Sequence, residues 1–454
     1  MTLEEIANRL GDALARSTAD ETELCWLETA GDGAATRSLA EPEPSAGRTI
    51  LVRVREGRRR GAFRTGSGEP AEIAAGIRQA VAVSRAVGAG EPLGSGSPAA
   101  AEPAPEADRQ PRGAVDSPAG LWDEEIAALE PGQARALLAD ATGAGERASL
   151  EWRRTRVVVV TSHGVDRRAE ATTVTAQVIA GEGARAAAPR AEEPGAGRAA
   201  ASARSLAALE LPAVVLRARR RSADRLAEDP PPPGPLLFSQ EAACALVSLL
   251  AGTALSARAF ETEGAPLAGL LGEHVFSPAL DLVDDGLDPA GLPFPFDLLG
   301  RSKRRVALVE GGVPRTPAVD EPLADRLRLP PTPHAVGPEE ARPEHLFLLP
   351  RGSEDEVLAA AEGGVWIGGL EGLVCLDPSR LAARARAVGV RRVRDGRLAE
   401  GLPDLVWQDS LLRLFSRLLA VGGEPVRLAE PGFLGGVSAP LIAVDGAEEL
   451  RPIP

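Results

Sequence analysis

Histidines are the residues of this chain best suited to metal or acid–base chemistry, and the sequence contains only four, His163, His274, His334 and His345. A zinc protease needs two neutral imidazoles about one helical turn apart, and a carboxylate that takes a proton from the bound water. Neither HExxH nor HExxxH occurs anywhere in the chain. The histidine spacing therefore predicts no zinc centre.

The sequence context of each histidine indicates a structural role. His163 follows Thr161-Ser162 in a turn, with no second ligand at a defined spacing. His334 and His345 lie in and beside the proline-rich stretch 329–343, a poor setting for a preorganised metal site. His274 lies in a Gly-Glu-His segment. Its side chain could face an internal groove, but we favour a structural role.

Other arrangements are weaker still. The pair Asp284-Asp285 suggests acid–base or Ca²⁺ chemistry, but adjacent strand residues point to opposite faces, and carboxylates that end a strand usually serve a turn. The chain has no G-x-S-x-G elbow, and none of Cys25, Cys244 and Cys375 has a convincing histidine partner. The sequence predicts no catalytic residue.

Four segments in a fixed order carry a family resemblance. They are Gly272–Pro278, Leu280–Gly286, Pro295–Asp297 and Ala307–Val313. This order resembles the C-terminal half of the TldD/PmbA family of metalloproteases. In that family the TldD branch carries an HExxxH zinc motif on a preceding helix, and the PmbA (TldE) branch keeps the framework without the motif. The chain resembles the second branch.

The resemblance places the motif position on six residues that cannot bind zinc. These are Ser248, Leu249, Leu250, Ala251, Gly252 and Thr253. The family's third ligand is a cysteine near the C-terminus, and the comparable stretch Glu430–Gly436 contains no ligand. Glu241, the nearest carboxylate, stands alone. The resemblance thus implies no metal or other cofactor in this chain, with zinc only in a TldD-type partner.

The resemblance also suggests which residues line a peptide-binding cavity. The basic run Arg301–Arg305 is most simply a solvated edge, but in the family it lies near a substrate-facing turn, so contact with an acidic peptide is the alternative. The residues expected to contact a peptide or the cavity are Glu273, His274, Asp284, Asp285, Asp297, Arg301 and Arg304.

Residue patterns and the resemblance together predict an α+β chain of three domains. We expect a small N-terminal hairpin-and-helix domain (1–87), a flexible Ala/Pro/Glu-rich linker (88–118), a central β-hairpin and helix domain (119–230) and a large β-rich C-terminal domain (236–454). Within them, segments 199–209 and 411–421 are predicted to be helices.

The composition of the chain argues against some classes of function. The net charge of −14 argues against nonspecific binding to nucleic acid. No run approaches the roughly 20 apolar residues of a membrane helix, and the first residues do not resemble a signal peptide, so we expect a cytoplasmic protein. The basic residues are arginines except for Lys303, which is typical of a GC-rich genome.

Two functional hypotheses follow. The first is a non-catalytic subunit that pairs with a TldD-like, HExxxH-bearing homologue and helps to process unfolded peptides in a shared cavity. The second is a stand-alone homodimer that binds a peptide or another ligand and has lost proteolysis, suggested by the short, proline-rich stretch 313–345. A hydrolase with an unrecognised site is a weaker third. Activity of the chain alone stays uncertain.

Overall fold

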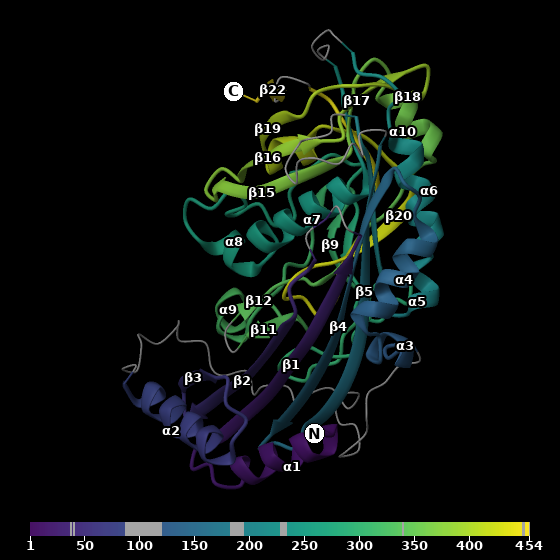
Figure 1. Cartoon of the computed structure of the whole chain (residues 1–454). Coiled ribbons are helices and arrows are strands. Elements are labelled where there is room, and N and C mark those ends of the chain that lie inside the picture. Colours follow the sequence, from purple (N-terminus) through teal and green to yellow (C-terminus); the bar gives the residue numbers. More distant parts are fainter. Residues whose placement is uncertain are drawn as a thin grey trace.

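A computed structural model describes most of the chain, shown in Figure 1. The described residues are 1–36, 39, 41–86, 120–181, 195–227, 234–337, 340–446 and 450–453. The segment expected to be a flexible linker, 88–118, lies outside them. Figure 1 shows β1, β4 and β5 running along the molecule, with α1 and α2 at one end and a small sheet of β15, β16 and β19 at the other.

The N-terminal half builds one antiparallel sheet of six strands in the order β3-β2-β1-β4-β5-β6. Its strands are β1 (Glu21–Ala35), β2 (Ser45–Glu56), β3 (Arg59–Thr65), β4 (Glu146–Thr161), β5 (Asp166–Ala180) and β6 (Gly197–Ala203). Strand β1 pairs with both β2 and β4, so the segments expected as N-terminal and central domains share this sheet.

Side-chain alternation gives the sheet two buried faces. On β4, Val158 and Val160 pack under helices, whereas Val157 and Val159 pack against Phe294 and neighbours from the C-terminal half. The covering helices are α1 (Leu3–Leu14), α2 (Pro70–Ala86), α3 (Glu124–Ala127), α4 (Pro131–Ala141), α5 (Leu206–Leu209) and α6 (Leu211–Arg221). The sheet is therefore a layer between helices and the C-terminal half.

The C-terminal half is built on a ten-stranded mixed sheet. Its strands, in spatial order, are β10 (Val313–Pro314), β9 (Val306–Glu310), β8 (Leu282–Asp284), β13 (His345–Leu348), β21 (Gly436–Val444), β7 (Leu236–Phe238), β14 (Val365–Ile367), β17 (Arg391–Arg394) and β18 (Arg397–Gly401), with β20 (Leu418–Ala429) paired to β21. The interior strands β7, β13 and β21 are buried throughout.

Smaller elements complete the C-terminal half. A four-stranded sheet packs with α7 over the main sheet, and Trp407 contacts Phe238 edge-on, with ring centroids 6.0 Å apart. Its strands are β15 (Gly369–Asp377), β16 (Ala382–Val388), β19 (Leu405–Ser410) and β22 (Leu450–Pro452). The remaining elements are α7 (Gln240–Ala254), α8 (Ala257–Glu261), α9 (Glu321–Leu327), α10 (Glu354–Ala360), α11 (Leu411–Ser416), β11 (Ala335–Gly337) and β12 (Glu340–Ala341).

The predicted α+β class is confirmed, but two local predictions are wrong. Residues Gly197–Ala203 form β6 rather than a helix, because pairing along the whole end of β5 outweighs the helix propensity of alanine. The helix expected over 411–421 ends at Ser416, and Leu418 begins β20 because β21 offers it a pairing edge. Among the described helices, none is long and apolar enough to span a bilayer.

Candidate functional site

Helix α7 carries the six residues at the expected motif position. The hydroxyl of Ser239 caps the helix by accepting a hydrogen bond from the amide of Ala242 (3.1 Å), and it donates one to the carbonyl of Gly368 (2.8 Å). The buried side of α7, with Leu246 and Leu250, packs on the main sheet. This anchoring leaves Ser248, Leu249, Gly252 and Thr253 on its more accessible side.

The chemistry of that accessible side is limited. The hydroxyl of Thr253 donates to the carbonyl of Leu249 in its own helix (2.6 Å), which leaves its proton unavailable to a ligand. Leu249 and Gly252 offer no polar side-chain atom. Among the described residues, no three His, Cys, Asp or Glu side chains are arranged to hold a metal ion.

The stretch 430–436, hereafter the C-terminal loop, reaches α7 from the far end of the sequence. The hydroxyl of Ser248 lies near the carboxyl of Glu430 and favours its ionised form. Burial raises the pKa of Glu430, while Ser248 and the nearby Arg342 partly oppose that rise. The two segments that the resemblance aligns with ligand positions therefore approach each other, and the polar groups that they bring together are a hydroxyl and one carboxyl.

Basic side chains hold the C-terminal loop in place. The buried guanidinium of Arg204 donates to the carbonyls of Leu434 (2.7 Å), Pro293 (2.7 Å) and Leu292 (3.1 Å). Arg342 lies over the ring of Phe433, 4.4 Å from its centroid. Burial, and then the neighbouring Arg153, lower the pKa of Arg204 to about 9. Backbone oxygens, rather than a carboxylate, stabilise this buried cation.

A cluster of buried titratable groups lies next to the C-terminal loop. Asp284 is part of it and contacts the other members through both carboxylate oxygens. Oδ2 accepts hydrogen bonds from the amides of Glu344 and His345 (both 2.8 Å), and Oδ1 lies 3.2 Å from Nε2 of His334. Burial alone would raise the pKa of Asp284, but His334 and then Lys303 hold it far below its usual range. We call Asp284, Lys303, His334 and His345 the buried cluster.

The predicted contact residues fall into two groups. Glu273, His274 and Arg304 are exposed, and Asp285 is partly exposed, 3.8 Å from Arg305 across an ion pair. Asp297 and Asp284 have exposed fractions of only 1% and 0%. The carboxylate of Asp297 accepts hydrogen bonds from the amides of Leu299, Arg301 and Ala335 and so shapes the loop that precedes Arg301. Peptide contact by any of these residues stays a prediction.

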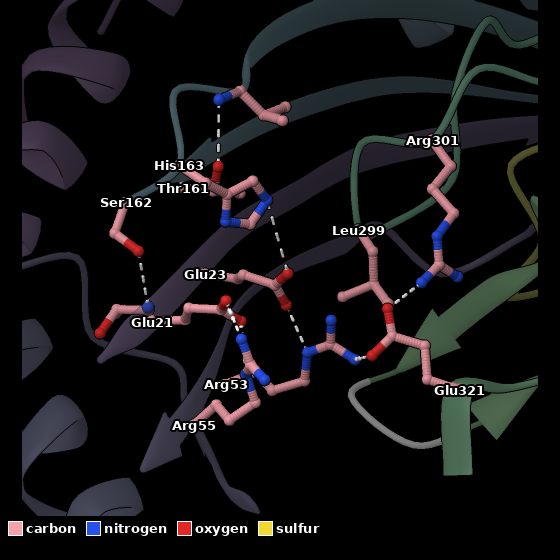
Figure 2. A network of polar contacts seen from close by, with 12 residues as sticks. Glu21, Glu23, Arg53, Arg55, Thr161, Ser162, His163, Leu299, Arg301 and Glu321 are labelled. Carbon is pink, nitrogen blue, oxygen red and sulfur yellow. Dashed lines mark hydrogen bonds and ion pairs between the residues drawn. The ribbon is translucent and has the colours of Figure 1, made fainter. Parts of the chain in front are cut away.

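Arg301 belongs to an ion-pair network that joins the two halves of the chain. Figure 2 shows Arg53 of β2 between the carboxylates of Glu23 and Glu321, with Arg301 on the far side of Glu321. Burial would raise the pKa of Glu321, but Arg53 and then Arg301 lower it to about 2. We call these four residues the inter-half network. His163 lies 4.0 Å from Glu23 and is about half exposed.

Sequence reasoning missed two parts of this region. Arg204 gave no signal, because an arginine in an arginine-rich chain has no distinguishing context. The buried cluster left one signal, the single lysine of the chain, which lies in it with an exposed fraction of 4%. The aliphatic stem of Lys303 fills the space beside Gly286, where a Cβ atom would lie 2.7 Å from its Cγ.

Comparison with known proteins places the C-terminal half in a family. Residues 233–448 match the model of the PmbA/TldA metallopeptidase C-terminal domain. A comparison with curated proteins found no match.

Solved structures match over nearly the whole chain. A proposed modulator of a DNA gyrase from Thermotoga maritima is 20% identical, with a TM-score of 0.74 over 98% of this chain and 100% of that one. TldE from Thermococcus kodakarensis is 18% identical, with a TM-score of 0.73 over 99% of this chain and 100% of that one. At such identities the likeness establishes a shared fold.

Proposed function

Because the chain belongs to the TldD/PmbA family, whose C-terminal domain it carries at residues 233–448, we propose that it is a PmbA/TldE-like, non-catalytic subunit of a TldD-type zinc metalloprotease. The contact between Ser248 and Glu430 is the observation that supports this role most directly. The helix and the C-terminal loop approach each other as a framework for metal ligands requires, but a hydroxyl and one carboxyl do not make a zinc site.

In this proposal the catalytic zinc belongs to a TldD-like partner, and the present chain contributes walls and peptide contacts. Glu273, His274 and Arg304 are the exposed candidates for those contacts. Unfolded peptides present free backbone amides and carbonyls, so pairing with a strand edge would hold them independently of sequence. The proposed setting is the cytoplasm.

Affinity capture of the tagged full chain from its native host tests the partnership. The expected result is co-elution of an HExxxH-bearing homologue in equal amount, identified by mass spectrometry. Capture of the chain alone, as a dimer, would overturn the proposal and favour the homodimeric binding protein instead.

The purified chain gives a second, independent test. Measured by itself, it should contain no stoichiometric zinc and should cleave no unfolded peptide. Stoichiometric zinc together with peptide cleavage by the chain alone would contradict a non-catalytic role, whatever the capture experiment shows.

A further inference from the structure

The buried cluster contains polar atoms without hydrogen-bond partners. Asp284, His334 and His345 have exposed fractions of 0%, 0% and 2%. Within the described ranges, neither ring nitrogen of His345 nor Nδ1 of His334 has a hydrogen-bond partner, and Nε2 of His334 has only its 3.2 Å contact with Oδ1 of Asp284, which lacks hydrogen-bond geometry. Native proteins satisfy most buried polar atoms, so a concentration of unsatisfied atoms at one place calls for an explanation.

His345 lies directly against the C-terminal loop. A Cβ atom on Gly435 would come within 2.5 Å of Cδ2 of the His345 ring and of the carbonyl oxygen of Glu344, so the loop backbone is in close contact with both residues. Gly436 pairs with His345 where β21 meets β13, and the amide of Leu434 donates to the carboxylate of Glu344 (3.5 Å). Any change in the size or charge of this imidazole acts on the loop.

The groups around His345 oppose its protonation. Lys303, Arg204 and His334 oppose the charged form, whereas the carboxylate of Asp284 favours it. Burial first, and then Lys303, lower the pKa of His345 well below its ordinary value of about 6.5. The imidazole is therefore neutral while the loop is seated against it, and it regains an ordinary pKa if the loop leaves and water enters.

We propose that His345 is a proton-sensitive seat for the C-terminal loop: the neutral imidazole keeps the loop closed beside α7, and the imidazolium releases it. The released loop carries Glu430 away from Ser248 and so uncovers part of α7. The functional meaning of this release rests on the proposed function, which the inference deepens. Access to the α7 surface would then depend on pH.

The sign follows from proton linkage. The seated form binds fewer protons than the released form, so acidification favours release. With a released pKa of about 6.5, the equilibrium constant for release rises about tenfold from pH 7.5 to pH 5.5. Asp284 and Arg204 keep their charges across this window, because their pKa values lie well below and well above it. Burial raises the pKa of Glu344, so that residue opposes the trend where it titrates.

Hydrogen–deuterium exchange of the full chain at pH 7.5 and 5.5, corrected for the intrinsic exchange rate, tests the proposal. The amides of Phe433–Gly436 should show an opening constant about tenfold larger at pH 5.5. His345→Gln, neutral at both pH values, should reduce this change to less than about twofold. His163→Gln, a matched substitution of the exposed histidine, should keep it.

Three results would overturn the proposal: no rise in wild type, a retained tenfold rise in H345Q, or an equal rise at all core amides. If H345Q does not fold, Lys303→Met decides, because loss of the ammonium raises the pKa of His345 in the seated form and brings it closer to the released value. The rise in the opening constant on acidification should then be smaller than in wild type, and an equal or larger rise contradicts the proposal. None of these readouts involves a partner or peptidase activity, so they remain decisive if the proposed function fails.

Discussion

Ser248 on α7 and Glu430 of the C-terminal loop are 182 positions apart in the sequence, yet the serine hydroxyl lies close enough to the carboxyl to favour its ionised form. These two groups lie where helix and loop meet, and a hydroxyl with one carboxyl does not make up a zinc site.

Ser248→Ala should destabilise the chain by about 1 kcal/mol at pH 8 and by less at pH 5. Burial already raises the pKa of Glu430, and loss of the hydroxyl raises it further. The variant therefore loses stability relative to wild type only where Glu430 is ionised, at the higher pH. Urea unfolding at the two pH values measures this, with Ser256→Ala as the control, since Ser256 makes no capping hydrogen bond. A pH-independent loss would contradict the assignment.

Arg204→Met should lower the free energy of unfolding by at least about 3 kcal/mol. The substitution leaves the carbonyls of Leu292, Pro293 and Leu434 buried without their donor. Arg154→Met is the matched control, because Arg154 is exposed and donates one hydrogen bond, to the carbonyl of Ala127. A loss no greater than in the control, by urea unfolding, would show that the C-terminal loop does not depend on Arg204.

Glu321→Gln should make the chain less sensitive to acid. The folded pKa of Glu321 is about 2 and its ordinary value about 4.5, so its contribution is present above pH 4.5 and is lost as pH falls toward 2. That contribution is on the order of 3 kcal/mol at most, since the side chain keeps some solvent contact. Unfolding free energies from pH 7 to pH 3 should fall less steeply in the variant. Parallel curves would mean that the inter-half network contributes nothing measurable.

Lys303 should resist amine-reactive reagents in the folded chain. It is the only lysine, so the one other amine is the α-amino group of the chain, and 4% exposure shields its side chain. Intact-mass measurement should find a single label under native conditions and a second label in concentrated urea. Equal labelling of Lys303 and the α-amino group under native conditions would contradict its burial.

Local sequence signals predicted local structure. The hairpin expected in the N-terminal segment is formed by β2 and β3, which join at Glu56-Gly57, where Gly57 adopts a positive φ of 59°. The hairpin expected in the central segment is formed by β4 and β5, whose β-branched runs are long. The absence of zinc-motif histidines near Ser248 needed nothing beyond the sequence itself.

Long-range partners could not be predicted. Residues 199–203 form a strand because they pair with β5, and helix propensity carries no information about such a distant partner. The buried cluster joins Asp284, Lys303, His334 and His345 from separate segments, so spacing along the chain gave no pattern to recognise. The proline-rich stretch 329–343 suggested a poor setting for a preorganised site, whereas the structure buries both histidines.

Because β1 lies between β2 and β4, its two edges become paired at different times during synthesis. Strand β1 ends at Ala35 and its partner β4 begins at Glu146, so β1 leaves the ribosome long before one of its two edges can be paired. During that interval the nascent chain exposes a strand edge flanked by Cys25 and Trp26, which makes the half-built sheet a target for chaperones. Slowing translation between these two strands should therefore reduce the yield of folded protein more than slowing it after β5.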